Sequence, residues 1–186
     1  MRRHQAEHMH DRPHARGRSL YTPEERARRD ATVWTLVQGV LAPLQFLVFL
    51  VSLGLVLRFL ATGAGEAAAT VSIVAKTLLL YTIMVTGSVW EKVVFGKWLF
   101  AEPFFWEDMV SMAVLALHTA YLVMLLFGLG TSQQQMAVAL VAYAAYVVNA
   151  TQFLLKLRAA RLEAARAAAP PAAPASAPPS AKGLPA

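Results

Sequence analysis

Residues 33–57 read VWTLVQGVLAPLQFLVFLVSLGLVL, a stretch of 25 residues without a charged side chain. About 20 predominantly apolar residues are enough for a helix to cross the hydrocarbon core of a bilayer. The stretch therefore predicts a transmembrane helix. We expect no cleavable signal peptide, because the run is too long and begins only after about 30 mostly polar residues.

The remaining apolar residues predict three further spans. Residues 109–155 contain no Lys, Arg, Asp or Glu, and one helix of that length would be about twice as long as the bilayer is thick. The turn-forming sequence GLGTSQQQ at 128–135 divides this run into two. Residues 67–90 form another apolar stretch, interrupted by Lys76. We predict an all-α integral membrane protein, a four-helix transmembrane bundle with helices over about 33–60, 68–91, 107–128 and 134–157.

The composition of the whole chain fits this class. Of its 186 residues 57% are apolar and 15% charged, against about a quarter charged in soluble domains. The absence of cysteine excludes disulfide scaffolds and zinc ribbons. We expect the chain to be surrounded by membrane lipid and to have no nucleic-acid partner.

The basic residues predict the orientation of the spans. Eight arginines precede the first span, four basic residues follow the last, and the loop between the second and third spans carries Lys92 and Lys97. The loop after the first span carries Arg58, and the last hairpin carries no basic residue. Because basic segments stay on the cytoplasmic side, we expect both termini and the central loop to be cytoplasmic.

Three segments follow one another along the chain. Residues 1–30 are expected to form a basic arm with a short amphipathic entry helix, which begins at the capping sequence TPEE (22–25). Residues 31–162 form the transmembrane domain, and the Ala/Pro-rich residues 163–186 form a disordered tail. The histidines of the arm are interpreted as part of a solvated basic segment rather than as a metal site: His4, His8, His10 and His14.

Each predicted span carries one stripe of polar residues at helical spacing. In chain order the stripes are Gln38, Gln45 and Ser52; Lys76, Gly87, Trp90 and Glu91; Glu107, Ser111, His118 and Tyr121; and Tyr146, Asn149, Gln152 and Lys156. Polar side chains inside a membrane face the bundle interior. We therefore expect the stripes to converge on a polar core or a ligand pocket.

Simpler interpretations exist for several of these residues. Hydrogen bonds between helices are ordinary packing in membrane bundles and would account for Gln45, Ser52 and Asn149. His118 is either a packing residue or a ligand for a metal or a carrier of protons. Lys76 is expected to extend its amine toward the interface.

The loop WEKVVFGKWLFAEPFFWED (90–108) combines aromatic and acidic residues. If the loop is short, Glu91, Glu107 and Asp108 meet at one cytoplasmic edge, where burial and mutual repulsion would keep a proton on one of them as a general acid. Alternatively, the acids complement a helix dipole and Glu91 pairs with Lys92 or Lys97. The aromatic side chains are also typical of an interfacial belt.

Four segments resemble the 3-vinyl bacteriochlorophyllide hydratase family of phototrophic bacteria over about residues 19–162. They are ATVWTLVQGVLAPLQFLVFLVSL from 31, GSVWEKVVFGKWLFAEPFFWEDMVSM from 87, LHTAYLV from 117 and AYAAYVVNATQFLLKLRAAR from 142. The resemblance implies a lyase that adds water to the vinyl group of a tetrapyrrole and gives a 1-hydroxyethyl group. It also implies a multi-pass protein of the bacterial cytoplasmic or intracytoplasmic photosynthetic membrane.

This chemistry suggests roles for the polar residues. Glu91 or Glu107 is the expected acid, with Asp108 beside them, and His118 is the expected axial ligand of the magnesium, which belongs to the substrate. Lys92 or Lys97 is expected to bind the substrate carboxylate, and no enzyme metal or cofactor is expected. His118 lies about 16 Å of helix rise from Glu107, so the macrocycle would have to stand upright in the bundle. Further residues expected to contact the substrate are Trp90, Trp106, Tyr121 and Asn149.

Two other functions remain open at this point. A non-catalytic tetrapyrrole carrier or photosystem assembly factor would use the same pocket and His118. A small proton-coupled transporter is suggested by Lys76 and His118, although the sequence has no internal repeat. Association with a second copy or with other pigment-synthesis enzymes is also left open.

Overall fold

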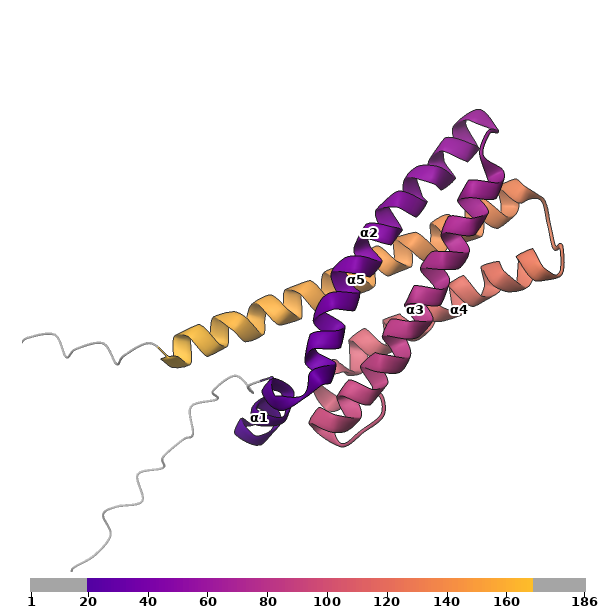
Figure 1. Ribbon diagram of the computed structural model, residues 1–186. Coiled ribbons are helices and arrows are strands. Elements are labelled where there is room, and N and C mark those ends of the chain that lie inside the picture. The colour runs from indigo at the N-terminus through magenta and orange to yellow at the C-terminus, as the bar shows by residue number, and fades with distance from the viewer. Residues whose placement is uncertain (1–19, 169–186) are drawn as a thin grey trace, which may run out of the picture.

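The computed structural model describes residues 20–168, which form helices and connecting loops without a β-strand. The elements are α1 (Pro23–Ala31), α2 (Val33–Thr62), α3 (Glu66–Phe95), the 3-10 turn η1 (Glu102–Phe104), α4 (Phe105–Leu126) and α5 (Ser132–Ala168) (Figure 1). The four helices α2 to α5 are long and apolar enough to cross a membrane. The predicted all-α architecture with four such helices is confirmed. Most of the predicted basic arm and tail, residues 1–19 and 169–186, lies outside the described residues.

Two helices run further than their predicted ends, for local reasons. Helix α3 continues to Phe95 because Gly96 is the residue that ends it, with the left-handed φ of 79° that closes many helices. Helix α5 continues to Ala168 because the sequence LRAARLEAARAA (157–168) consists of strong helix formers. It thus includes residues 163–168, which were predicted to belong to the tail. At the other end of the chain, Thr22 and Glu25 form the capping box that begins α1, as predicted.

The four long helices form two hairpins. A short turn at 63–65 joins α2 to α3, and the turn at 127–131 joins α4 to α5. Contacts within each hairpin greatly outnumber those between the hairpins, which involve α2 with α5 and α3 with α4. The loop between α3 and α4 lies at the same end of the bundle as α1, opposite the two hairpin turns (Figure 1). This end therefore collects the central loop, α1 and the later part of α5.

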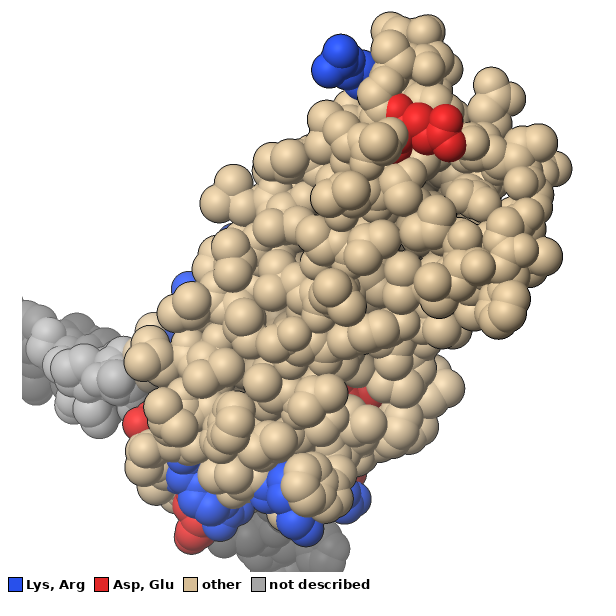
Figure 2. All heavy atoms as spheres, turned by 45° about the vertical axis from the view of Figure 1, so that its right-hand side comes forward, with Lys and Arg blue, Asp and Glu red and all other residues tan. Residues whose placement is uncertain are grey.

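The surface separates charged ends from an uncharged middle. In Figure 2 the blue and red side chains lie at the two ends, and the broad band between them is almost entirely tan. This band exposes many large apolar side chains, among them Leu47, Val51, Val71, Leu78, Val147 and Val148. An apolar surface of this extent is unsuited to water and is suited to contact with lipid.

The polar stripes converge in the interior, as predicted. Buried polar members are Gln45, Ser52, Lys76, Glu91, Glu107, Ser111, His118 and Asn149. Some of them bond across helices: Ser52 Oγ lies 2.5 Å from Tyr143 Oη, and Asn149 Nδ2 donates to Ser111 Oγ at 2.7 Å. The interpretation of Ser52 and Asn149 as interhelical packing contacts is thus confirmed.

The prediction that Lys76 extends to the interface is wrong. Its side chain is 0% exposed, and its Nζ lies 3.9 Å from the centre of the Tyr146 ring. Lys76 is ten residues from the start of α3 at Glu66, which corresponds to about 15 Å of rise. That distance exceeds the reach of a lysine side chain, and the face of α3 that carries Lys76 turns toward α5.

Candidate functional site

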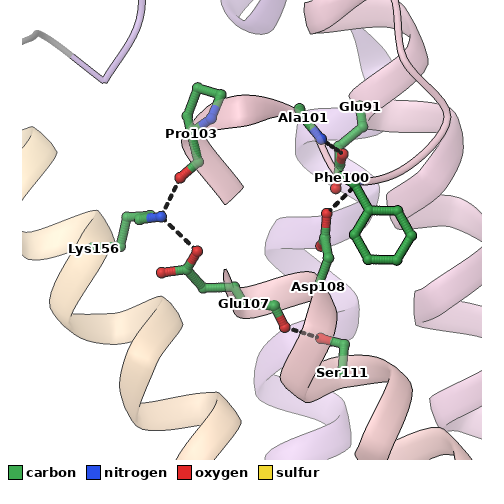
Figure 3. A network of polar contacts seen from close by, with 8 residues as sticks. All are labelled: Glu91, Phe100, Ala101, Pro103, Glu107, Asp108, Ser111 and Lys156. Atoms are coloured by element: carbon green, nitrogen blue, oxygen red, sulfur yellow. Dashed lines mark hydrogen bonds and ion pairs between the residues drawn. The ribbon is translucent and has the colours of Figure 1, made fainter. Parts of the chain in front are cut away.

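The loop between α3 and α4 folds back over the end of the bundle (Figure 3). Phe100 has a φ of 58°, the one positive φ outside glycine among the described residues. A left-handed conformation costs a residue with a side chain about 1–2 kcal/mol. It allows two successive backbone N–H groups, of Phe100 and Ala101, to reach carboxyl groups on the flanking helices.

Glu91 and Asp108 form a buried pair of acids under this loop. Ala101 N–H donates to Glu91 Oε2 at 3.1 Å, and Phe100 N–H donates to Asp108 Oδ2 at 2.8 Å (Figure 3). Glu91 is 5% exposed and Asp108 is 4% exposed. The two carboxyl groups accept hydrogen bonds from adjacent residues of the same loop, so they are neighbours at the end of α3 and the start of α4. We call these two residues the carboxyl pair.

Glu107 is turned away from the carboxyl pair toward α5. Its Oε2 accepts from Lys156 Nζ at 2.5 Å, and the same Nζ donates to the carbonyl oxygen of Pro103 (Figure 3). The ammonium group also lies 5.0 Å from the centre of the Phe104 ring. Of the three acids expected to meet, two bond adjacent residues of the loop, and the third ties α4 and the loop to α5.

The alternative pairing of Glu91 with a loop lysine is not observed. Lys92 Nζ donates to the carbonyl oxygen of Gly96 at 2.9 Å and lies 5.9 Å from the centre of the Trp98 ring. Lys97 is exposed on the outer side of the loop. Both lysines face away from the interior, because they lie on the outer surface of the helix end and the loop.

The two predicted tryptophans have different surroundings. Trp90 packs edge-on against Phe95 and Phe104, each with ring centres 5.7 Å apart, and its Nε1 donates to Thr35 at 2.9 Å. Trp106 is 72% exposed and contacts Phe105. Trp90 therefore lies in the aromatic cluster beside the carboxyl pair, whereas Trp106 faces outward.

A hollow of about 400 Å³ opens on the outer side of the loop. Its lining includes Thr22 from the start of α1, Phe95 from α3, and Lys97, Ala101 and Glu102 from the loop. Ala101, whose N–H group bonds Glu91, therefore lies between the hollow and the carboxyl pair.

His118 lies deeper in the bundle and is 1% exposed. Its Nδ1 is 2.8 Å from the carbonyl oxygen of Val114, which can only accept, so Nδ1 carries a hydrogen. In neutral imidazole Nε2 then has a free lone pair, and it has no hydrogen-bond partner among the described residues. A histidine anchored in this way through its other nitrogen is typical of metal ligands.

Two further residues predicted to contact the substrate are Tyr121, which lies near His118, and Asn149, which lies between His118 and the carboxyl pair. Tyr121 is fully buried one turn beyond His118 on α4. Asn149 Nδ2 donates a hydrogen bond to Ser111 Oγ, and Asn149 Oδ1 has no partner among the described residues. Within residues 20–168 no cluster of three or more His, Asp or Glu side chains is arranged to hold a metal ion.

Two parts of the site were not anticipated. Lys156 was placed on the polar stripe of α5 but not assigned to the site, although its spacing from Asn149 and Gln152 already put it on the interior face. The loop N–H groups depend on the positive φ of Phe100, for which a phenylalanine gives no sequence signal.

The fold and the site define a small helical membrane protein with a buried acid pair at one end of its bundle. The chain belongs to the 2-vinyl bacteriochlorophyllide hydratase family, whose model, 2-vinyl bacteriochlorophyllide hydratase (BCHF), matches residues 21–159. The resemblance seen in the sequence is thereby confirmed.

Two relatives carry the same name, 2-vinyl bacteriochlorophyllide hydratase. The protein of Cereibacter sphaeroides is 68% identical over 154 residues, 81% of this chain and 94% of the relative. That of Rhodobacter capsulatus is 68% identical over 148 residues, 80% of this chain and 86% of the relative. No solved structure matches the chain.

The contact between Glu107 and Lys156 predicts coupled effects on stability. Lys156→Met leaves a buried carboxylate without its cation and is expected to lower the free energy of unfolding in detergent by about 2 kcal/mol, given partial solvent access. The double variant Glu107→Gln/Lys156→Met is expected to recover part of that loss. Thermal unfolding of the wild type, both single variants and the double variant measures the coupling, and strictly additive losses would contradict it.

Proposed function

We propose that this protein is a hydro-lyase that adds water to the vinyl group of a bacteriochlorophyllide in bacteriochlorophyll biosynthesis. Its relatives bear the name of this activity, and the match covers nearly the whole length of one of them. The structural observation that carries the proposal is the carboxyl pair, because one protonated and one ionised carboxyl group supply both the acid and the base of a hydration. A tetrapyrrole is accordingly the substrate.

The reaction requires one proton transfer from the carboxyl pair to the substrate and one from water to the carboxyl pair. Proton transfer from the carboxyl pair to the terminal vinyl carbon leaves a cation on the carbon next to the ring, where the macrocycle delocalises it. The oxygen of a water molecule bonds to that carbon, and the water gives up a proton to the carboxylate. The pair then regains its proton, and the net change is one added water in the 1-hydroxyethyl product. No step requires a cofactor of the enzyme.

The loop positions the two carboxyl groups for these proton transfers. N–H donors aimed at both carboxyl groups stabilise the negative charge that remains after the proton leaves. The hollow beside Ala101 supports a route for water. Glu107 is the weaker candidate for the acid, because its carboxyl group is engaged by Lys156.

The substrate ring is proposed to enter the seam between the two hairpins, where contacts are fewest. His118 would bind the magnesium of the pigment through Nε2. Asp108 and His118 are ten residues apart on α4, about 15 Å, so the ring stands along the bundle axis with its vinyl edge toward the carboxyl pair. Asn149 Oδ1 and Gln152 Oε1, both without partners among the described residues, lie on α5 in this interval and can accept hydrogen bonds from water.

We expect turnover to be lost when either member of the carboxyl pair becomes an amide. Glu91→Gln and Asp108→Asn remove the transferable proton and should lower kcat by about 10²- to 10⁴-fold with pigment binding retained. The assay follows the mass and the absorption spectrum of a 3-vinyl pigment, whose product is heavier by one water and has a blue-shifted long-wavelength band.

Glu24→Gln, on the exposed face of α1, is the matched control and should keep wild-type turnover. Full activity in both pair variants would remove the assignment of the acid. Stoichiometric pigment binding by the wild-type protein without any change in pigment mass would instead identify a carrier.

The proposed magnesium contact predicts a metal-dependent effect at His118. His118→Ala should weaken binding of the magnesium pigment about tenfold or more and leave binding of the demetallated pigment near the wild-type value. Absorbance titration of both pigments measures this difference. Equal weakening for the two pigments would assign His118 to packing alone.

The distribution of basic residues supports an orientation in a bacterial membrane. Of the described residues, Arg26, Arg28, Arg29, Lys92, Lys97, Arg158 and Arg161 belong to the end of the bundle that holds the central loop, and the opposite end has Arg58. This asymmetry favours a cytoplasmic position for the central loop and both termini, in the cytoplasmic or intracytoplasmic membrane.

Single cysteines test this orientation, since the chain has none of its own. A cysteine at Lys97 should react with a membrane-impermeant thiol reagent only after the cells are opened. A cysteine at Thr131, in the turn between α4 and α5, should react in intact cells with a permeable outer membrane. The reverse pattern would invert the proposed topology.

A further inference from the structure

Lys76 is a buried basic residue that the proposed reaction does not use. It lies in the middle of α3, and its Nζ has no hydrogen-bond partner among the described residues. The ion pairs found within residues 20–168 join Arg29 to Asp30 and Glu107 to Lys156, and neither involves Lys76. Its surroundings are aromatic: the centres of the Tyr146 and Tyr143 rings lie 3.9 and 5.8 Å from Nζ.

A lysine in this position lowers the stability of the folded bundle unless a partner offsets its burial. An amine within the bilayer core is disfavoured, and ionisable residues there generally mark a site for a ligand or an ion. Two tyrosine rings offset part of the cost through cation–π contacts but provide no negative charge. Leucine or methionine would fill the same space at no electrostatic cost, so the ammonium group indicates an anionic partner that enters the bundle.

The position of Lys76 relative to His118 restricts what that partner is. The His118 ring and the Lys76 amine are each 5.8 Å from the centre of the Tyr143 ring, so the two groups are neighbours of one side chain. A chlorophyllide has a central metal and, at its rim, one free propionate, which is the carboxylate of an otherwise uncharged periphery. A nitrogen ligand and an ammonium group close together fit these two features of a single molecule.

We propose that Lys76 binds the propionate carboxylate of the pigment and so makes the enzyme selective for the free acid over its esters. The inference rests on the proposed function, whose substrate it describes further. Bound at His118 and Lys76, the macrocycle is fixed at two points at mid-bundle, and its vinyl edge is left to face the carboxyl pair.

The loop lysines are weaker candidates for this role. Lys92 is occupied by the carbonyl of Gly96, and Lys97 is exposed to solvent. An ion pair in water contributes little, whereas a carboxylate beside Lys76 is shielded from water on all sides. The predicted carboxylate contact is therefore reassigned from the loop to the bundle interior.

The test compares a 3-vinyl magnesium chlorin free acid with its methyl ester in detergent. The wild-type protein is expected to bind and hydrate the acid at least about 30-fold better than the ester, in line with the loss of one partner from a buried charge pair. Lys76→Met should raise KM for the acid by a similar factor, change kcat little, and leave KM for the ester unaltered. Arg58→Met, which removes an exposed cation at the opposite end, should keep the wild-type preference.

Equal binding of acid and ester by the wild-type protein would overturn the inference, and this result needs no variant to fold. It would also be overturned if Lys92→Met or Lys97→Met abolished the preference while Lys76→Met retained it. Binding is measured separately from turnover. Preferential binding of the acid without hydration would therefore support the role of Lys76 and refute the hydratase activity. Hydration of both pigments at equal rates would support the hydratase activity and refute the role of Lys76.

Discussion

Two backbone hydrogen bonds, from Ala101 to Glu91 and from Phe100 to Asp108, organise the functional end of this bundle. Carboxyl groups buried at a membrane edge need donors, and in this chain the loop that joins their helices provides them. The left-handed turn at Phe100 is tolerated because it makes both bonds available. Without these donors both carboxyl groups would lose the hydrogen bonds that offset the cost of their burial.

A second tie secures the same end against α5. Lys156 bonds both the side chain of Glu107 and the loop carbonyl of Pro103, so one ammonium group connects three segments. Three neighbouring acids consequently have different roles. Glu107 bonds α5, whereas Glu91 and Asp108 bond the loop and are the acid and base of the proposed reaction. Their difference arises from which helix each carboxyl group faces.

The four long helices follow from the apolar runs and the turn residues between them, because length and the absence of charge almost determine a transmembrane segment. The interior faces were predictable from the sequence as well, because polar side chains at helical spacing are stable only in the interior of a bundle that lipid surrounds. The extension of α5 to Ala168 was missed because the Ala-rich residues after Leu162 were interpreted as a tail, although alanine and arginine favour the helix.

Details of the site depend on tertiary contacts that no local pattern contains. The rotation of Glu107 toward Lys156 requires knowing that α5 packs beside α4, and the burial of Lys76 requires knowing that two tyrosines of α5 surround its amine. The grouping of Glu91, Glu107 and Asp108 at one edge was predictable from the short loop. The sequence did not predict which two of these three acids form a pair.

The division of the bundle into two hairpins bears on how the protein matures. Glu91 belongs to the first hairpin and Asp108 to the second, so the carboxyl pair does not exist until both have been inserted into the membrane and have docked. In a half-assembled chain each of these acids lacks the other as a neighbour. The proposed site of hydration therefore forms only when the second hairpin packs against the first.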